Sequence, residues 1–388
     1  MKRSKNIHEN ILLGITGSIA AYKIPELIRR LQKEGHSVRV IMTDNARHFA
    51  GKSAIETLTG TNVYDTLWAD RTDTEHIKLS QWADILVIAP ATANMLGKCA
   101  NGIADDLLST VFLSFDGPVI FVPAMNTKMY NNAIVSANIE RLIQFGYEIM
   151  EPASGELACG DTGKGRMPQP MDIVYRIKRV LGNKKFKGKN ILVTGGAFSV
   201  WLDPVRTITN MSSGKTGRAF ALQSYIAGAD NVTLIEGSAS EEFLISEIEL
   251  LKCSSAEELK DTLISIIDNY DILIMCAAVP DFTTHKSKSK IKASGSLELK
   301  MTKGIDILKS IKDKSIVKIG FALETDNPKD NALKKLEEKS LDYIVLNSPD
   351  NIGSIRGSAT VLSSNGEERI IEDKTKPELA REILNWIE

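Results

Sequence analysis

Two short segments in the first half of the chain combine the small and polar residues that favour phosphate binding. The first is Gly14-Ile-Thr-Gly17-Ser18-Ile-Ala-Ala, and the second is Ala89-Pro-Ala-Thr92-Ala93-Asn94-Met-Leu-Gly-Lys98. Small residues at a strand-to-helix turn let backbone N–H groups approach an anion. Two such loops at the carboxyl edge of one sheet are what a mononucleotide requires. The alternative is that the segments are only tight turns, with Thr92 or Asn94 capping a helix.

Three further groups in the first half have side chains suited to acting on a substrate. His76 stands just before an apolar run, although a lone histidine is more often structural or solvated. Asn126 ends the segment Pro-Ala-Met-Asn, where its amide could hold a carboxylate or simply make a turn. Residues 155–167 place four glycines around Cys159, a pattern that predicts a mobile flap carrying a thiol.

The second half contains one more candidate phosphate loop, Asn210-Met-Ser212-Ser213-Gly214-Lys215-Thr-Gly. The segment is not a P-loop, because that motif needs Gly where this chain has Thr209. Ser-Ser-Gly-Lys at the start of a helix is nevertheless a suitable phosphate cradle, and an N-capped helix is the alternative. The lysine run 286–292 that follows Asp281 is, taken alone, typical of a solvated loop.

The elements that must position these residues are short apolar runs that alternate with helical patterns in both halves. The expected strands of the first half are 10–16, 37–43, 84–90, 118–123 and 147–151. Those of the second half are 190–195, 231–236, 271–278, 316–322 and 342–347, followed by a hairpin turn at Asn365-Gly366 and a closing helix over 376–387. The sequence therefore predicts an α/β protein with two Rossmann-like domains. Each has a mainly parallel sheet flanked by helices, and the second carries an appended β-hairpin.

The predicted boundary between the domains is a basic, glycine-containing stretch. It gives a first domain over residues 1–183, a linker over 184–189 and a second domain over 190–388. The length of 388 residues agrees with two domains, since roughly 100–200 residues per domain is usual.

Composition argues against several classes of protein. The 48 Lys and Arg residues nearly cancel the 49 Asp and Glu residues, so no electrostatic footprint for nucleic acid is present. No apolar stretch reaches the roughly 20 residues that span a bilayer, which predicts no membrane partner. The four cysteines are scattered without paired spacing, which indicates neither a disulfide framework nor a zinc site and favours the reducing cytoplasm.

Together, the first-half motifs resemble those of the homo-oligomeric flavin-containing cysteine decarboxylases. The resemblance rests on Gly17–Ala20, His76, residues 89–98, residues 123–126 and the Cys159 flap. With the second half included, the chain resembles the bifunctional phosphopantothenoylcysteine decarboxylase/phosphopantothenate–cysteine ligases of coenzyme A biosynthesis, over nearly its whole length and in the same order. The resemblance implies a homo-oligomer that uses FMN and Mg²⁺ as cofactors. Its substrates would be 4'-phosphopantothenate, cysteine and CTP.

The resemblance assigns roles in a decarboxylation to the first half. Loss of CO₂ from a cysteinyl carboxylate leaves a carbanion, which needs an electron sink. In this family the cysteine side chain is oxidised at FMN to a thioaldehyde, whose C=S group accepts those electrons. His76 would be the base for the oxidation, Asn126 would hold the carboxylate, and Cys159 would donate a proton in the reductive step. The residues implied to bind FMN are Gly17, Ser18, Thr43, Thr92, Ala93 and Asn94.

The second half would catalyse the ligation that precedes decarboxylation. The carboxylate of phosphopantothenate attacks CTP, and cysteine captures the resulting acyl-cytidylate. By resemblance, Asn210 assists formation of the acyl-cytidylate and Lys290 acts in the ligation. The residues implied to bind CTP and phosphopantothenate are Ser212, Ser213, Gly214, Lys215, Ala277, Ala278, Asp281, Gly304, Ile305, Asp306, Ile307, Phe321, Lys335 and Lys339.

This half also departs from the family pattern. Phe198, Ser199, Val200 and Trp201 stand where the family usually has Thr, Arg and Glu, and Gly304 to Ile307 replace Asn-Pro-Asp-Ile. Asn347 is followed by Ser-Pro rather than the usual Asp. Loss of a carboxylate beside a magnesium-bound triphosphate would weaken metal binding.

Three other functions are compatible with parts of the sequence. The second domain could bind or assemble without ligating, beside an active decarboxylase. Thr194-Gly195-Gly196 after a strand suggests a nicotinamide oxidoreductase, but no Tyr-x-x-x-Lys follows it. A flavin-binding regulatory protein without turnover is the third, and the presence of His76 and Cys159 argues against it.

Overall fold

The computed structural model describes residues 8–68, 74–156, 160, 162–239, 245–292, 297–324 and 326–387. The chain divides into two compact units, Met1–Val180 and Leu181–Glu388. Each unit has its own parallel sheet with helices packed on it, so the predicted fold class is confirmed.

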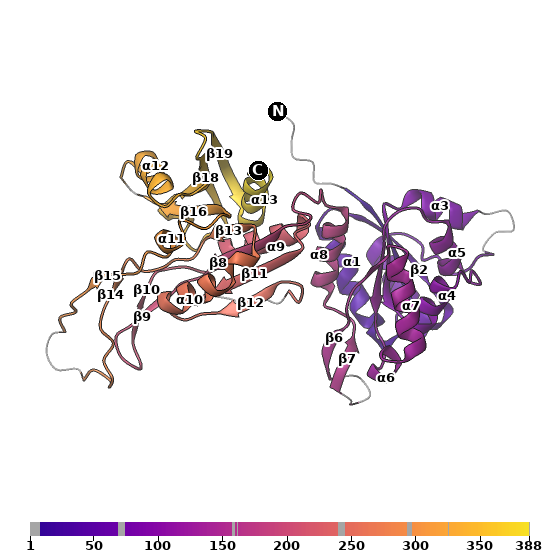
Figure 1. The fold of residues 1–388 in the computed structure, drawn as a ribbon. Coiled ribbons are helices and arrows are strands. Elements are labelled where there is room, and N and C mark those ends of the chain that lie inside the picture. Colours follow the sequence, from indigo (N-terminus) through magenta and orange to yellow (C-terminus); the bar gives the residue numbers. More distant parts are fainter. Residues whose placement is uncertain are drawn as a thin grey trace. The chain divides into compact units, whose positions relative to one another are not determined.

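The first unit is built on a five-stranded parallel sheet in the order β2-β1-β3-β4-β5 (Figure 1). Its strands are β1 (Asn10–Ile15), β2 (Ser37–Met42), β3 (Ile85–Ala91), β4 (Val119–Pro123) and β5 (Glu148–Ile149), which lie where the sequence predicts them. The chain leaves β1 for β2 on one side and then returns to add β3 on the other. The strand order therefore reverses between β1 and β3, which is the position where open α/β sheets bind ligands.

Helices cover both faces of this sheet. One face is packed by α3 (Glu75–Trp82), α4 (Ala93–Ala100), α5 (Leu107–Ser114) and α7 (Ala133–Gln144) around a core that includes Leu12, Leu86 and Phe121. On the other face, α1 (Ile24–Lys33) buries its apolar stripe beside α8 (Pro170–Leu181), with α2 (Lys52–Thr59) against α1 (Figure 1). The smaller elements of the unit are η1 (Ile19–Lys23), η2 (Asp44–His48), α6 (Thr127–Tyr130), β6 (Ala153–Glu156) and β7 (Thr162–Arg166).

The second unit has an eight-stranded sheet in the order β12-β11-β8-β13-β16-β17-β18-β19. Six strands are parallel: β8 (Asn190–Gly195), β11 (Asn231–Glu236), β12 (Glu249–Lys252), β13 (Ile272–Met275), β16 (Val317–Leu323) and β17 (Tyr343–Asn347). The last two, β18 (Arg356–Ser363) and β19 (Glu368–Thr375), form the antiparallel hairpin expected at Asn365-Gly366.

Five α-helices accompany this sheet: α9 (Lys215–Ile226), α10 (Ala256–Ile266), α11 (Ile307–Ser310), α12 (Pro328–Glu338) and α13 (Lys376–Trp386). Helices α9 and α13 pack against each other. Two short hairpins, β9 (Ser199–Trp201) with β10 (Thr207–Thr209) and β14 (Phe282–Thr283) with β15 (Thr302–Lys303), extend away from the sheet of this unit (Figure 1). The sequence analysis did not foresee these arms. The remaining short helices are η3 (Ile267–Asn269) and η4 (Pro349–Asn351).

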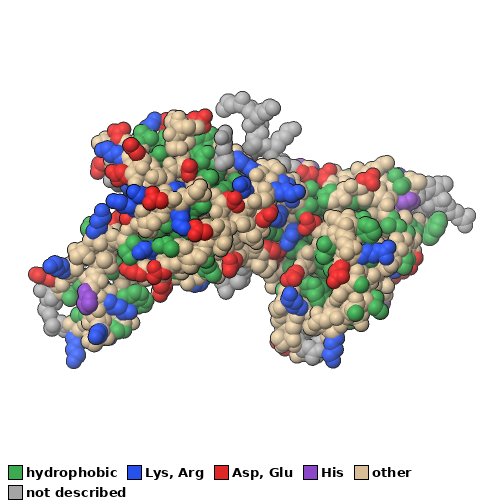
Figure 2. Space-filling model, in the orientation of Figure 1, with side chains coloured by type: hydrophobic (Ala, Val, Ile, Leu, Met, Phe, Trp, Pro, Cys, Tyr) green, Lys and Arg blue, Asp and Glu red, His purple; other side chains and the backbone are tan. Residues whose placement is uncertain are grey.

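The surface agrees with the balanced composition. Positive and negative side chains are interspersed over the visible face of the molecule rather than gathered into one basic area (Figure 2). Within the described ranges, no helix combines the length and the apolar character needed to cross a membrane.

A buried charge cluster holds the start of α9 to the sheet of the second unit. Glu236, at the end of β11, is fully buried and accepts two hydrogen bonds from Arg218 of α9, at 2.6 and 3.1 Å. Lys252 at the end of β12 donates to the same carboxylate at 2.6 Å. Burial by itself would raise the pKa of Glu236, but the hydrogen bonds from Arg218 and Lys252 bring it below its ordinary value of 4.5.

Arg218→Met should therefore destabilise the chain by about 3 kcal/mol or more, because it removes one partner of a buried carboxylate. Lys252→Met is the matched control and should cost less than about 1 kcal/mol, since the Lys252 side chain is 58% exposed and water can replace it. Because the pKa of Glu236 is lowered by folding, its stabilisation is present above pH 4.5 and disappears as the pH falls through the folded-state pKa. Urea unfolding of the whole chain would measure both variants, and equal losses would contradict the assignment.

Candidate active sites

At the carboxyl edge of the first sheet, hydrogen bonds join the loops that follow β1, β3 and β4. Thr16 is buried, and its hydroxyl donates to the carbonyl oxygen of Pro90 at 2.6 Å and accepts from the backbone N–H of Thr92 at 3.1 Å. The Ser18 hydroxyl donates to the carbonyl oxygen of Ala124 at 3.4 Å. The two predicted phosphate loops are therefore neighbours, held together through one threonine at the switch point between β1 and β3.

The loop after β2 joins the same group. The backbone N–H of Thr43 donates to the carbonyl oxygen of Ile15 at 3.0 Å. A Cβ atom on Gly17 would lie 2.5 Å from the Cβ of Asn45, so only glycine allows these two loops to pack this closely. The residues predicted to bind FMN all belong to this cluster of loops: Gly17, Ser18, Thr43, Thr92, Ala93 and Asn94.

Helix capping also occurs in these loops. Thr92 is the N-cap of α4, and its hydroxyl accepts from the backbone N–H of Met95 at 3.4 Å. Ser18 caps η1 in the same way. Capping and ligand binding are compatible here, because Ala93 and Asn94 are the first residues of α4, where backbone N–H groups have no helical acceptor.

The loop after β4 contacts the hairpin that carries the predicted flap. Asn126 is the N-cap of α6, and its Oδ1 accepts from the backbone N–H of Lys128 at 2.8 Å. The backbone N–H of Met125 donates to the carbonyl oxygen of Gly165 in β7 at 3.0 Å. A Cβ on Gly165 would lie 2.1 Å from the carbonyl oxygen of Met125, so glycine is required for this contact. The hairpin is thus anchored beside Asn126, while Cys159, which lies between β6 and β7 in the sequence, is outside the described residues.

His76 is half-buried in the first turn of α3, which packs against α5. A position of His76 beside the loop cluster stays a prediction.

Two of the described cysteines near the candidate sites are poor nucleophiles. Burial raises the pKa of the Cys99 thiol in α4 to about 12. Burial also raises the pKa of Cys276, just after β13, well above its ordinary value. Neither thiol is ionised near neutral pH.

The second unit contains a cavity of about 900 Å³ at the carboxyl ends of β13, β16 and β17 and at the start of α9. Asn210 and all the residues predicted to bind CTP and phosphopantothenate line it. Lys290 does not: it is exposed and lies outside this lining. Segments that are spread from residue 210 to residue 339 thus meet around this one cavity. The role of each lining residue in binding stays a prediction.

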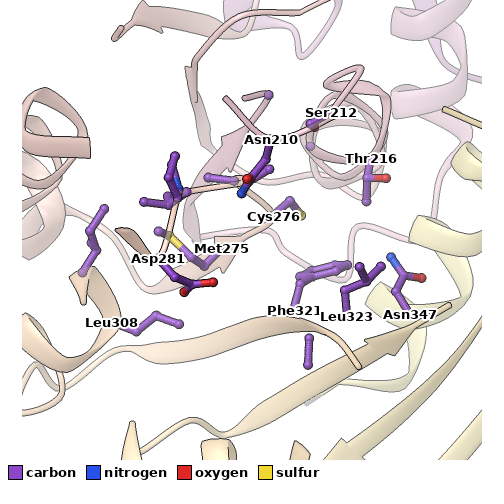
Figure 3. A pocket seen from close by; sticks show the side chains of 18 of the residues that line it. Asn210, Ser212, Thr216, Met275, Cys276, Asp281, Leu308, Phe321, Leu323 and Asn347 are labelled. Atoms are coloured by element: carbon purple, nitrogen blue, oxygen red, sulfur yellow. The ribbon is translucent and has the colours of Figure 1, made fainter. Parts of the chain in front are cut away.

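Both polar side chains and the aromatic ring of Phe321 line the cavity. In Figure 3 the side chains of Asn210 and Asp281 come from different loops on one side. Thr216 of α9 and Asn347 at the end of β17 lie near Phe321 of β16. The Phe321 ring packs edge-on against Phe220 of α9, with 5.4 Å between ring centroids, which fixes its position.

Two of the predicted nucleotide-binding lysines already have ionic partners. Lys335 donates to Glu324 at 2.5 Å, and Lys339 lies 3.4 Å from Asp306. These pairs leave the lysines at the cavity wall and hold α12 to the segments that bear Glu324 and Asp306. Over the described residues, no group of three or more His, Cys, Asp or Glu side chains could hold a metal ion.

A buried carboxylate clamps the segment beside Lys290. Asp203 accepts backbone N–H groups from Val205 at 2.7 Å, Arg206 at 2.8 Å and Ile291 at 3.0 Å. The hydrogen bond from Ile291, the largest cause, and those from Val205 and Arg206 lower the pKa of Asp203. Arg206 also donates to the carbonyl oxygen of Ile291 at 2.8 Å. The Asp-Pro-Val-Arg motif therefore fixes the backbone next to Lys290, outside the cavity.

The apolar residues that depart from the family pattern have structural roles. Phe198 is fully buried in the core with Leu192 and Ile235. Val200 is also buried and pairs with Ile208 across the β9–β10 hairpin. Lys286 lies over the ring of Trp201 at 5.0 Å, which joins this hairpin to the lysine run.

The sequence analysis missed several lining residues of the cavity: Met211, Thr216, Cys276, Leu308, Leu323, Asn347, Asn351 and Lys376. Cys276, Leu323 and Asn347 are apolar or small polar residues at or just after strand ends, which carry no signal of their own. Lys376 opens the closing helix, far along the chain from the other members, so no local motif includes it.

Comparison with known proteins covers both units. The family model described as Flavoprotein matches residues 1–182, and the model described as DNA/pantothenate metabolism flavoprotein C-terminal domain matches residues 186–388. The Coenzyme A biosynthesis bifunctional protein CoaBC of Bacillus subtilis (strain 168) is 37% identical over 98% of this chain and 97% of its own length. The protein of the same name from Vibrio vulnificus (strain CMCP6) is 38% identical over the same shares.

Among solved structures, the C-terminal domain of a Coenzyme A biosynthesis bifunctional protein CoaBC matches with a TM-score of 0.45 and 33% identity, over 52% of this chain and 94% of that one. The sequence relationship extends along the whole chain and includes both units in the same order. The chain therefore belongs to the family of coenzyme A biosynthesis bifunctional proteins CoaBC.

Proposed function

We propose that this chain catalyses two consecutive steps of coenzyme A biosynthesis. The second unit ligates cysteine to 4'-phosphopantothenate with CTP, and the first unit decarboxylates the product to 4'-phosphopantetheine. The observation that supports this most strongly concerns the residues implied to bind ligands. Those implied for FMN lie on a single group of loops, and those implied for CTP and phosphopantothenate line a single cavity. Assay of both half-reactions on the purified chain tests the proposal.

The loop cluster of the first unit fits FMN. It provides the first backbone N–H groups of α4 for a phosphate, hydroxyl-bearing residues from three loops, and a position at the β1–β3 switch point. FMN would supply the two-electron oxidation and reduction that the substrate cysteine side chain needs in order to lose CO₂. Gly17, Ser18, Thr43, Thr92, Ala93 and Asn94 would hold it.

The chain's own groups would then manage the substrate's protons and charge. Asn126 would orient the substrate carboxylate from the loop after β4. His76 would accept a proton during oxidation of the cysteine side chain. Cys159, which lies between β6 and β7 in the sequence, would return a proton in the reductive step.

In the second unit, the start of α9 and Asn210 would bind the acid whose carboxylate attacks CTP. Lys335 and Lys339 would neutralise phosphate charge, and Phe321 would pack against an apolar part of the ligands. Mg²⁺ would accompany the triphosphate, with Asp281 as an exposed carboxylate on the cavity wall. Lys290 lies outside the cavity, so its proposed role in ligation requires the arm that carries it to approach the bound ligands.

One observation argues against a nicotinamide oxidoreductase. Dinucleotide-binding folds use an acidic residue after the second strand to hold the ribose hydroxyls. The corresponding carboxylate in this unit is Glu236, which is fully buried and accepts hydrogen bonds from Arg218 and Lys252. A buried carboxylate with these two cationic partners is not presented to a ribose.

We also infer a cytoplasmic homo-oligomer. In the first unit, apolar side chains of α7 such as Ile134 (74% exposed) and Ile143 (53% exposed) are accessible, as is Phe145 directly after it. A second copy of the chain could cover such residues. Cys99, Cys253 and Cys276 are free thiols, as expected in a reducing compartment.

The first prediction from this function concerns His76. His76→Asn should retain FMN but lose about 10²–10⁴-fold in decarboxylation, because the base for the oxidation is removed. The measurement is CO₂ release from 4'-phosphopantothenoylcysteine, together with the flavin absorbance of the protein. His48→Asn, an exposed histidine in η2, is the control and should behave as wild type. Near-normal turnover of His76→Asn would show that His76 is not the base and has only a structural role.

A second prediction concerns Cys159. Cys159→Ser should still oxidise and decarboxylate the substrate but should fail to protonate the ene-thiol, so the oxidised product accumulates. Mass spectrometry would detect a product two hydrogen atoms lighter than 4'-phosphopantetheine. Normal formation of the reduced product at the normal rate would show that the proton comes from another group.

A third prediction concerns ligation. The full chain should release pyrophosphate from CTP in the presence of 4'-phosphopantothenate and Mg²⁺, and CMP when cysteine is added. Asn210→Asp should impair pyrophosphate release, whereas Lys290→Gln should release pyrophosphate but block capture by cysteine. Lys288→Gln, another exposed lysine of the same run, is the control. If the wild-type chain releases no pyrophosphate with any nucleoside triphosphate, the second unit only binds or assembles.

A further inference from the structure

Lys376 is a buried lysine on the wall of the second unit's cavity that lacks an ionic partner. It is the first residue of α13 and is only 6% exposed. Among the described residues it forms no ion pair with a carboxylate, and its side-chain hydrogen bond is to the carbonyl oxygen of Asn351 at 3.3 Å. That carbonyl already accepts from the Ser354 hydroxyl at 3.0 Å. A buried ammonium with such weak compensation reduces the stability of the fold.

The nearest acidic residue in sequence does not compensate this charge. Glu378 is engaged in a capping box at the start of α13, where it accepts from the backbone N–H of Thr375 at 2.9 Å and from its hydroxyl at 2.8 Å. Burial lowers the pKa of Lys376, and of its neighbours only the Cys276 thiol opposes that effect. Lys335 and Lys339, on the same cavity, have Glu324 and Asp306 as partners. Lys376 thus differs from both of these lysines.

We propose that Lys376 binds a phosphate group of a ligase substrate in this cavity. A lysine ammonium is a compact point charge that suits phosphate oxygens, and a hydrogen bond to an ionised group is stronger than one between neutral groups. The phosphate belongs either to the nucleoside triphosphate or to 4'-phosphopantothenate, and both offer the same chemistry to Lys376. The inference rests on the proposed ligase function for the identity of these ligands.

Phosphate binding would explain why a lysine stands at position 376, where an apolar residue would make the fold more stable. A group that binds substrate in a buried position commonly lowers the stability of the empty protein. A lysine with a purely structural role would have the opposite signature, since its replacement would lower stability. Stability and affinity should therefore change in opposite directions when Lys376 is replaced.

Binding to the full-length chain, measured by titration calorimetry with Mg²⁺ present, tests the proposal. The probes are CTP with cytidine as its phosphate-free counterpart, and 4'-phosphopantothenate with pantothenate as its counterpart. Lys376→Met should lose about 10- to 100-fold in affinity for one of the two phosphorylated compounds and should leave its phosphate-free counterpart unchanged. The compound affected identifies which phosphate Lys376 binds. Lys376→Arg keeps the charge and should lose less.

Lys374→Met is the matched control. Lys374 lies two residues away, pairs with Glu382 at 3.0 Å and is outside the cavity lining, so its replacement should not change phosphate binding. The thermal midpoint of Lys376→Met should equal or exceed that of the wild type.

The outcomes separate this inference from the proposed function. If the wild-type chain binds neither CTP nor 4'-phosphopantothenate, the ligase proposal fails and the inference fails with it. If the wild type binds both and Lys376→Met binds both equally well, only the role of Lys376 is wrong. A Lys376→Met chain that unfolds or melts at a lower temperature would also overturn the inference, because it would identify a structural lysine.

Discussion

Parallel strands end at the same edge of a sheet, and both candidate sites depend on this constraint. In the first unit it collects the loops after β1, β2, β3 and β4, which no sequence neighbourhood contains together. In the second unit it places the ends of β13, β16 and β17 beside the start of α9. Within each edge, a few side chains then set the spacing. The Thr16 hydroxyl joins the loops after β1 and β3, and the edge-on contact of Phe220 with Phe321 joins α9 to β16.

Buried charges serve three different purposes in the second unit. Glu236 is satisfied by Arg218 and Lys252, and this cluster fixes the start of α9 against the sheet. Asp203 is satisfied mainly by backbone N–H groups, and it fixes the segment next to Lys290. Among the described residues, the Lys376 ammonium has a long hydrogen bond to a carbonyl oxygen and no carboxylate partner. Because desolvation disfavours all three charged groups, the number and quality of their partners separates structural roles from a role in binding.

The residues that depart from the family pattern also acquire a physical explanation. A polar, acidic loop was expected before the Asp-Pro-Val-Arg motif, and an apolar one stands there instead. Phe198 extends the core, and Val200 and Trp201 build the β9–β10 arm against which Lys286 packs. The substituted residues thus belong to the core and the arm and are not part of the cavity lining.

The sequence alone determined the α/β class, the positions of the parallel strands other than β12, and the appended hairpin, because these follow from local periodicity and turn residues. It also singled out the loop of residues 210–217, which lines the cavity, whereas the roles it gives His76 and Asn126 stay predictions. It did not reveal the β9–β10 and β14–β15 arms, the clamp of Asp203 on Ile291 or the lysine at position 376. The clamp and the cavity bring together segments far apart in the sequence, such as 203 with 291 and 212 with 376, for which local pattern has no signal. The arms are built from strands of only two or three residues, which are too short to show a periodicity. Tertiary structure decided them, since only folding places such segments at a common sheet edge and determines which buried charges find partners.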